Sequence, residues 1–478
     1  MHKNLGIIKS FFVLMASERL DVSYLTDSNG LFGGYGHTHG FEYALLQSGL
    51  LEWSGPLYSF GDNGDLQGGN VAQGGTASSI ATASGLGYGN TGDAVCTRFR
   101  GNSTMGTAIN GAGTYRNGTT KPSAGHLAYM DTTNTGNAAP NDYLYKPAAL
   151  NGTNWWASHS VGCIISGGAA NPLDATGKLR VNAWLGQFGA GNGTDGIESA
   201  WFDNGITVSG TTEALLCNGT ADTVAKRTTV PIPAGARAGD VEWRCPVGGT
   251  GPWLGYYFRP YNENRPVGFS VSTYYSCGSQ STYDVAYWIL NSPFTTLQFY
   301  LQCLVDGQGL TKRALFVFTM GPNDLTETNK LGGAPAGSAS SAGVVKYNMI
   351  QAIARLQAAW ALLGYQSENL RFLIQCHPPI ANPDNQNYTD YRNAAAELAG
   401  EYPANIASVD LSLIVSYAEL ADNSFDPTFN SNGSDVNHLK NKRSYEIVNL
   451  AIVNLILNVR ATGDATGVST RFGRGRRK

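Results

Sequence analysis

The sequence predicts an α/β protein in which a mostly parallel sheet, covered by helices on both faces, is interrupted by a β-rich insertion. At both ends of the chain, apolar runs of strand length alternate with segments of helical periodicity, the pattern of such a sheet. Between residues 62 and 291 the helical signal is absent, and turn-forming Gly, Asn and Thr are abundant. The 478 residues exceed the ~250 at which single cores stop growing, so more than one domain is expected.

The N-terminal segment, residues 1–20, holds an apolar run from Gly6 to Ala16 that Lys9 interrupts. The run loosely resembles a short signal peptide, but it is interpreted as a packed N-terminal helix or arm. It is too short to span a bilayer, and no other stretch approaches that length. The sequence therefore predicts no membrane span.

The first strand and helix follow this arm. Asp21–Leu25 is an apolar run that predicts a strand, Thr26–Gly30 predicts a tight turn, and Phe41–Leu51 predicts a helix. Strand, turn and helix in this order begin a doubly wound sheet. Leu57–Phe60 is the candidate for its second strand.

The insertion has two parts. Residues 62–160 are interpreted as long ordered loops, because the aromatic residues among them give the segment something to bury. Residues 161–291 contain short runs between turn clusters, which predicts a β-sandwich or jelly roll. The eight runs are Val161–Ile165, Leu179–Phe188, Ala214–Cys217, Arg227–Ile232, Val241–Cys245, Trp253–Phe258, Val267–Tyr275 and Tyr283–Leu290.

Helix and strand alternation then resumes. The predicted elements are helices at Thr296–Val305, Val344–Leu363, Asp390–Ala399 and Lys442–Leu457, and strands at Ala314–Met320, Leu370–Cys376 and Ala407–Leu411. Apolar strands flanked by helices favour a parallel sheet covered on both faces. The α/β domain is thus predicted to comprise residues 21–61 and 292–460, with the insertion between its second and third strands.

The charge balance excludes broad electrostatic binding of nucleic acid. The net charge is −3 and the isoelectric point is near 6.2. The one basic cluster lies in the C-terminal tail, residues 461–478, which ends in RFGRGRRK. This tail is interpreted as a solvated end, the alternative being a contact with an acidic partner or polynucleotide. The seven cysteines form no CxxC pair, which argues against a zinc ribbon.

Three polar turns follow predicted strands or precede the last helix. Ser28 lies in the turn after the first strand, Asn323 follows the strand Ala314–Met320, and Asp435 and His438 precede the last helix. Parallel sheets place ligands at the carboxyl ends of their strands. Separately, these residues have ordinary interpretations as an N-cap, a turn and a loop. Together, their types and order are those of a nucleophile, an oxyanion donor and an Asp–His base pair.

These residues resemble the motifs of the SGNH or GDSL hydrolases. The resemblance rests on Asp27 with Ser28, on Gly321, Asn323 and Asp324, and on Asp435 with His438, and it excludes the insertion. It implies a flavodoxin-like α/β sheet and a serine esterase with Ser28, Asp435 and His438 as catalytic residues. The chain departs from the family pattern at Thr26, where Gly is usual, and at Asn29, where Leu is frequent.

The resemblance also implies an oxyanion hole and a two-step acyl transfer. The donors would be the Ser28 amide, a glycine amide and the Asn323 side chain. Gly61 is preferred as the glycine because it directly follows the candidate second strand, and Gly75 is the alternative, from the Asn70–Gly75 segment. No metal or organic cofactor is required. His37 and His39 lack a third metal ligand and are interpreted as a loop rim over the site.

The predicted partner is an acetylated glycan. The β-rich insertion is rich in Tyr and Trp, which serve as core or as platforms for sugars. Its expected place beside the catalytic cleft suggests that it helps to hold a polymer, as carbohydrate-binding modules do in esterases that deacetylate polysaccharide. The resemblance therefore implies an O-acetyl esterase acting on a cell-surface polysaccharide. The low charge, the abundant Gly, Asn and Thr, and the basic C-terminal tail also resemble those of phage tail and virion proteins. This resemblance implies an extracellular or virion-surface location. The alternative function is a non-catalytic virion decoration or adhesion protein, whose N-terminal arm and basic tail contact other virion proteins.

Overall fold

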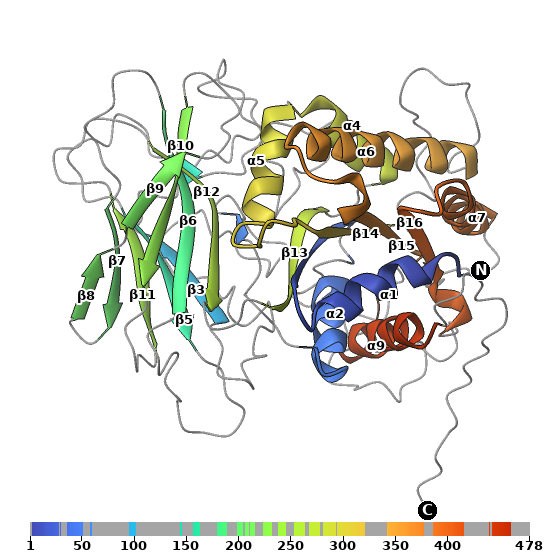
Figure 1. Ribbon diagram of the computed structural model, residues 1–478, viewed down its shortest axis with the longest axis horizontal. Helices are drawn as coiled ribbons and strands as arrows, with labels where there is room; N and C mark the ends of the chain where they lie inside the picture. The colour runs from blue at the N-terminus through green and yellow to red at the C-terminus, as the bar shows by residue number, and fades with distance from the viewer. Residues whose placement is uncertain are drawn as a thin grey trace, which may run out of the picture.

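The α/β part of the chain is built on a five-stranded parallel sheet in the computed structural model (Figure 1). The strands, in spatial order, are β13 (Gly268–Cys277), β1 (Arg19–Asp27), β14 (Ala314–Met320), β15 (Leu370–Cys376) and β16 (Ile406–Asp410). Numbered along the chain, this order is 2-1-3-4-5, the flavodoxin-like doubly wound arrangement.

The structure describes residues 2–27, 29, 36–50, 58–59, 95–101, 144–145, 156–162, 179–188, 198–203, 206–209, 211–215, 223–231, 238–244, 253–262, 267–277, 281–292, 294–320, 342–376, 386–414, 439 and 442–459. None of the helices in these ranges has the length and hydrophobicity of a bilayer-spanning segment.

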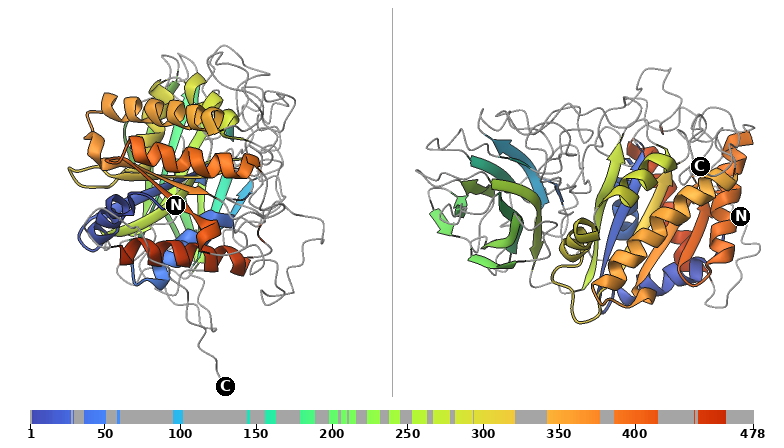
Figure 2. Two further views of the ribbon diagram at one scale, coloured as in Figure 1. Left: turned by 90° about the vertical axis from the view of Figure 1, so that its right-hand side faces the viewer. Right: turned by 90° about the horizontal axis from the view of Figure 1, so that it is seen from above.

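Helices cover both faces of the sheet (Figure 2). One face packs against α1 (Leu5–Leu14), α2 (Gly36–Gln47) and α9 (Lys442–Asn458), and the other against α4 (Thr282–Asn291), α5 (Phe294–Leu304), α6 (Ala342–Leu362) and α7 (Gln386–Glu401). Side chains alternate along each strand, so β1, β14, β15 and β16 contribute to both cores. In β14, Leu315 and Val317 belong to the first core and Phe316 and Phe318 to the second. The predicted fold class, a parallel sheet with helices on both faces, is confirmed.

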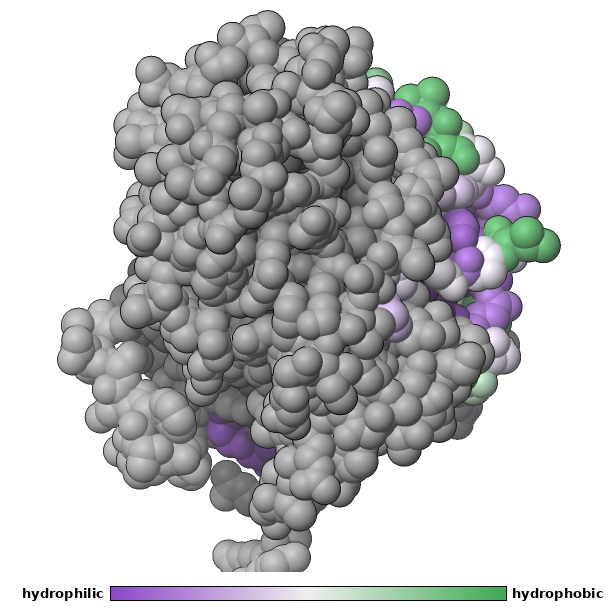
Figure 3. Space-filling model, turned by 90° about the vertical axis from the view of Figure 1, so that its left-hand side faces the viewer, coloured by the Kyte–Doolittle hydropathy of each residue, from purple (hydrophilic) through white to green (hydrophobic). Residues whose placement is uncertain are grey.

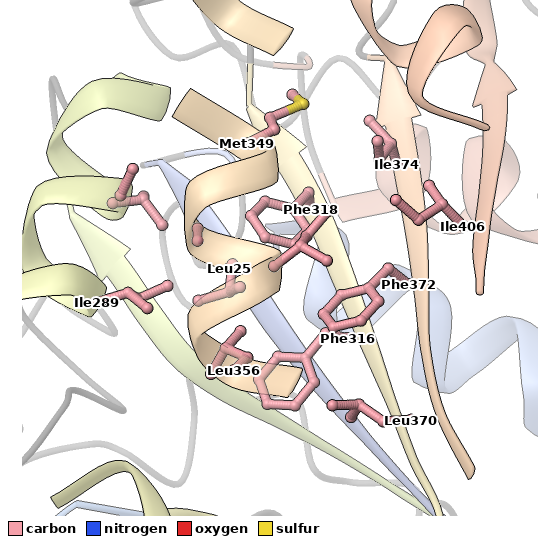
Figure 4. Close-up of a cluster of buried hydrophobic side chains, with 14 of the residues drawn as sticks. Leu25, Ile289, Phe316, Phe318, Met349, Leu356, Leu370, Phe372, Ile374 and Ile406 are labelled. Atoms are coloured by element: carbon pink, nitrogen blue, oxygen red, sulfur yellow. The ribbon is translucent and has the colours of Figure 1, made fainter. Parts of the chain in front are cut away.

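A cluster of aromatic and aliphatic side chains fills the space between α6 and the sheet (Figure 4). The Phe316 and Phe372 rings stack with their centroids 6.0 Å apart, Leu356 of α6 lies beside Phe316, and Met349 of α6 lies near Phe318. Full burial of a side chain of this kind stabilises a fold by about 1.5–3 kcal/mol. The cluster therefore makes the middle of the sheet a rigid support for its carboxyl ends.

The insertion forms two antiparallel sheets that pack as a sandwich beside the α/β domain (Figures 1 and 2). One sheet has the order β2-β12-β6-β10-β9, with β4 also paired to β12, and the other has the order β3-β5-β11-β7-β8. The strands are β2 (Tyr58–Ser59), β3 (Val95–Gly101), β4 (Leu144–Tyr145), β5 (Trp156–Gly162), β6 (Leu179–Phe188), β7 (Glu198–Asp203), β8 (Ile206–Ser209), β9 (Thr211–Leu215), β10 (Thr223–Pro231), β11 (Ala238–Arg244) and β12 (Trp253–Asn262).

The predicted second strand of the α/β sheet was wrong. The run Leu57–Phe60 contributes β2, which pairs antiparallel with β12 in the sandwich. The run Val267–Tyr275, predicted as a strand of the insertion, is instead β13, which pairs parallel with β1. The insertion therefore lies between the first helix and the second strand of the sheet. Both runs are short and apolar, and periodicity alone does not say which sheet a strand joins.

Two further predictions of secondary structure in this region were wrong. Tyr283–Leu290, predicted as a strand, lies in helix α4, whose residues Val285, Ala286 and Ile289 pack on the sheet. Its β-branched and aromatic residues favour strands, but tertiary packing overrides so weak a propensity. Residues 62–160, predicted as loops, contribute β3, β4 and most of β5 to the sandwich.

Two arginines attach the sandwich to the α/β domain. Arg259 of β12 is only 1% exposed, and it donates to the Leu304 carbonyl over 2.9 Å and lies 3.5 Å from an Asp21 carboxylate oxygen. Arg227 of β10 pairs with Asp306 over 2.5 Å. Because buried charges need partners, these contacts fix the sandwich to the α/β domain. They join it near the amino ends of β1 and β13, away from the carboxyl edge.

In the part of the described surface that Figure 3 colours, along its right-hand side, hydrophobic side chains lie among hydrophilic ones. Within the described ranges, the exposed large hydrophobic residues are Val13, Tyr287, Leu310, Leu362, Tyr402 and Leu413, scattered over different elements. Single exposed apolar residues are normal on protein surfaces.

The N-terminal segment covers the outer edge of the sheet. Lys3 forms an antiparallel bridge with Ser408 of β16, and the Asp410 amide donates to His2 Nδ1 over 3.3 Å. Helix α1 then packs against the sheet, and Lys9 Nζ donates to the Val459 carbonyl at the end of α9 over 2.6 Å. An edge strand covered in this way has fewer free backbone groups for pairing with another chain.

Acid is expected to weaken this edge contact. Burial lowers the pKa of His2 below its ordinary 6.5, and its Nδ1 must be unprotonated to accept the Asp410 amide. Since the folded pKa lies below the unfolded one, stability rises with pH through the window that ends near 6.5 and is constant above it. Urea midpoints at about pH 5 and pH 8 should therefore differ more for the wild type than for His2→Gln. Equal differences in the two proteins would contradict this account.

Candidate active site

The carboxyl ends of β13, β1 and β14 meet at one edge of the sheet. Asp27 pairs with Cys277, Thr26 pairs with Thr319, and Met320 pairs with Cys376. The strand order reverses at β1: the chain leaves β1 toward the face covered by α2 and leaves β14 toward the face covered by α6. Doubly wound sheets bind their ligands at such a switch point.

The predicted catalytic residues flank this edge in the sequence. Ser28 directly follows the last residue of β1, Asn323 is the third residue after β14, and His438 directly precedes Leu439, which is buried in the core with α9. The residues of the predicted catalytic and oxyanion set all lie outside the described ranges, so their roles stay predictions. The set is Ser28, Gly61, Gly75, Asn323, Asp435 and His438.

A buried ladder of polar side chains crosses the sheet below this edge. Thr26 Oγ1 donates to the Thr319 carbonyl over 2.8 Å, and Thr319 Oγ1 donates to Gln375 Oε1 over 2.7 Å. Gln375 Nε2 in turn donates to the Tyr24 hydroxyl over 3.3 Å. Burial raises the pKa of Tyr24 well above its ordinary value, so this hydroxyl stays protonated. The ladder ties β1, β14 and β15 together, with Thr26 two residues before Ser28 and Thr319 four residues before Asn323.

Thr26 is one of the two positions where the sequence departs from the motif that it resembles, and in the structure its hydroxyl forms the first bond of the ladder. Glycine at this position would have no hydroxyl to donate to β14. The second departure, Asn29, is also explained by the structure. Its side chain is 1% exposed, and its Oδ1 accepts a 3.0 Å hydrogen bond from the Tyr445 hydroxyl of α9.

His37 lies inside the protein and does not form a loop rim. It is the second residue of α2, its side chain is fully buried, and its Nδ1 lies 3.1 Å from Asn449 Nδ2. Its ring meets the Tyr445 ring edge-on, with centroids 5.0 Å apart. His39 is in the same helix, with its side chain outside the described set. The described residues contain no group of three or more His, Cys, Asp or Glu suited to hold a metal ion.

Gly61 does not follow a strand of the α/β sheet, as its predicted role in the oxyanion hole requires. The strand before it, β2, belongs to the sandwich. The residue that directly follows the second strand of the α/β sheet is Gly278, after Cys277. Residues 273 to 275 of β13 also contain an irregularity in register against β1, the kind of local bend that often occurs near active sites.

Tyr445, Gln375 and Gly278 lie near the candidate site but were not predicted from the sequence. Tyr445 and Gln375 gave no signal, because each acts through a contact with a residue far away in the chain. Gly278 became visible only when β13 was placed beside β1.

No protein-family model matches the sequence, and no curated protein matches it. Among solved structures, the chain is similar to a peptidoglycan O-acetylesterase, with 10% identity, coverage of 95% of this chain and 96% of that chain, and a TM-score of 0.47. It is also similar to a carbohydrate acetylesterase from Sinorhizobium meliloti, with 14% identity, 39% and 78% coverage and a TM-score of 0.25. A family two carbohydrate esterase from Cellvibrio japonicus gives 11% identity, 66% and 91% coverage and a TM-score of 0.24. The assignment of the fold rests on the observed sheet order.

Proposed function

We propose that this protein is a serine ester hydrolase that removes O-acetyl groups from a cell-surface polysaccharide. The observation that carries the proposal is the place of two motifs in the observed topology. The Asp27-Ser28 pair and the Gly321–Asp324 segment follow the two adjacent strands β1 and β14, between which a doubly wound sheet binds its ligand. A hydrogen bond between Tyr445 and Asn29 supports a place for the Asp435–His438 motif near Ser28. It joins α9, the helix that follows His438, to the residue that follows Ser28.

In the proposed mechanism, His438 accepts the proton of Ser28 while Ser28 Oγ attacks the ester carbonyl carbon. Asp435 holds the imidazole in orientation. The oxyanion is stabilised by the Ser28 amide, a glycine amide and the Asn323 side chain. His438 then gives the proton to the departing sugar oxygen, which leaves as a hydroxyl. In the second step His438 takes a proton from water as the water attacks the acetyl-Ser28 ester, and it returns that proton to Ser28 Oγ as acetate is released. This sequence of steps uses no metal or organic cofactor.

A polysaccharide substrate is proposed from the setting of the site. The sandwich lies beside β13, the edge strand next to β1, and is fixed there by Arg227 and Arg259. A domain attached rigidly to the α/β domain can hold a long substrate at a distance from the reacting ester, and the tryptophans and tyrosines of its strands offer the residue types that stack on sugars.

The proposal is tested by hydrolysis of p-nitrophenyl acetate by the wild type and by Ser28→Ala, with acetate release from an O-acetylated polysaccharide measured in parallel. We expect turnover to fall at least ~10³-fold in the variant, because the nucleophile is removed. Equal rates in the two proteins would reject the esterase. Turnover of the small ester without acetate release from the polymer would reject only the substrate class.

The choice of oxyanion glycine gives a separate prediction. We expect Gly278→Pro, which removes a backbone N–H, to lower kcat by about 10²–10³-fold, as loss of an oxyanion donor does. Gly61→Pro makes the same change beside a sandwich strand and should leave kcat within about twofold. Melting temperatures of the two variants control for loss of folding. The opposite ranking would restore Gly61 to the site.

A further inference from the structure

Tyr445 joins two segments that carry different predicted catalytic residues. It lies in the first turn of α9, seven residues after His438, and its side chain is fully buried. Its hydroxyl donates to Asn29 Oδ1 over 3.0 Å. Asn29 is the residue directly after Ser28 and is itself buried. One side-chain hydrogen bond therefore links the nucleophile turn to the helix whose start follows the Asp435–His438 motif.

The position of Tyr445 is fixed on several sides. Its ring lies edge-on to His37 of α2, and its carbonyl accepts a 2.8 Å hydrogen bond from Asn449 Nδ2. The same amide nitrogen lies 3.1 Å from His37 Nδ1. Helices α2 and α9 approach so closely at Gly40 that a Cβ there would lie 2.7 Å from the Tyr445 carbonyl carbon. Tyr445 is therefore a rigid anchor for Asn29.

We propose that Tyr445 is a positioning residue for Ser28, acting through Asn29. This inference rests on the proposed function, since it assigns a role in the same reaction. Nucleophilic attack requires the serine oxygen, the base and the oxyanion donors in one geometry, and a displacement of about 1 Å can lower the rate by about 10²-fold. A buried hydrogen bond to the next residue along the chain restrains that geometry without touching the substrate. Its loss should lower kcat and leave KM nearly unchanged.

The test compares Tyr445→Phe with Tyr300→Phe. Both changes remove one buried hydroxyl from an aromatic ring, but the Tyr300 hydroxyl bonds Ser23 over 2.7 Å on the opposite face of the sheet. We expect Tyr445→Phe to lower kcat for p-nitrophenyl acetate about tenfold, with KM within about twofold. The rate at which a fluorophosphonate labels Ser28 should fall by a similar factor. Tyr300→Phe should leave both rates within about twofold while lowering the melting temperature by a similar amount.

A double-mutant cycle tests whether the effect passes through Asn29. Asn29→Ala should reproduce the loss in kcat seen for Tyr445→Phe, and the double variant should lose little more, because both changes remove the same bond. Asn29→Asp keeps an acceptor oxygen and should restore part of the rate. Additive losses in the double variant, or a kcat that follows the melting temperature in all variants, would overturn the positioning role.

The outcome separates this inference from the proposed function. If Ser28→Ala abolishes turnover while Tyr445→Phe retains wild-type kcat, only the positioning role fails. A wild-type chain that neither hydrolyses the ester nor is labelled at Ser28 overturns both.

Discussion

Asp21→Asn is expected to lower the free energy of unfolding by about 3–5 kcal/mol, because it leaves two buried guanidinium groups without their carboxylate. Asp21 is fully buried, and its Oδ2 accepts from Arg19 Nε over 2.9 Å, Arg19 Nη2 over 2.6 Å and Gln308 Nε2 over 2.7 Å. Its Oδ1 accepts from the Ser270 hydroxyl and lies 3.5 Å from Arg259.

The charge of Asp21 is what keeps these arginines compatible with burial. Burial lowers the pKa of Arg19 to about 10, and the attraction of Asp21 opposes that shift. Arg259 belongs to the sandwich, so the loss should also weaken the attachment of the insertion to the α/β domain.

Glu397→Gln is the matched control for this prediction, because it makes the same carboxylate-to-amide change in an exposed ion pair, 3.2 Å from Lys346. Exposed pairs contribute about 0–1 kcal/mol, so its urea midpoint should hardly move. Equal midpoints for the two variants would refute a stabilising role of the buried cluster.

Gly40→Ala is expected to destabilise the protein by about 2–3 kcal/mol and to lower esterase activity as well. The new Cβ would lie 2.6 Å from Asn449 Nδ2 and 2.7 Å from the Tyr445 carbonyl carbon, with the Tyr445 oxygen closer still. Two of these atoms are backbone, so α9 has to move away from α2. That movement would carry Tyr445 away from Asn29 and shift the start of α9, which His438 precedes.

Gly400→Ala is the control, because Gly400 lies in helix α7 and a Cβ there meets nothing within 4 Å. Alanine is the better helix former by about 0.8–1 kcal/mol, so this variant should be as stable as the wild type or more so. The melting temperature and kcat of Gly40→Ala are compared with those of Gly400→Ala, and only Gly40→Ala should show a loss in both. If Gly40→Ala had the melting temperature of the wild type, α9 could move away from α2 without loss of stability, and the prediction would be wrong.

Much of the α/β frame was predictable from local pattern. The strands Ala314–Met320 and Leu370–Cys376 were predicted with the bounds observed for β14 and β15, because a largely buried strand is a short, mostly apolar run between turns. In the sandwich, the strand Leu179–Phe188 was also predicted with the bounds observed for β6. Helix α9 was predicted to within one residue from its periodic apolar face. The order of Ser28, Asn323, Asp435 and His438 relative to these elements also needed only the sequence.

The sequence by itself therefore determined the class of sheet and the order of the chemical motifs, because both depend on short-range patterns. Only the tertiary structure decided which apolar run stands beside β1, because β2 and β13 are alike in pattern and differ in the sheet they join. Only it brought Tyr445 to Asn29 and Arg259 to Asp21, because these contacts join residues hundreds of positions apart and depend on how helices and sheets pack. A side chain's role at such a contact comes from its neighbours in space, and periodicity along the chain does not contain them.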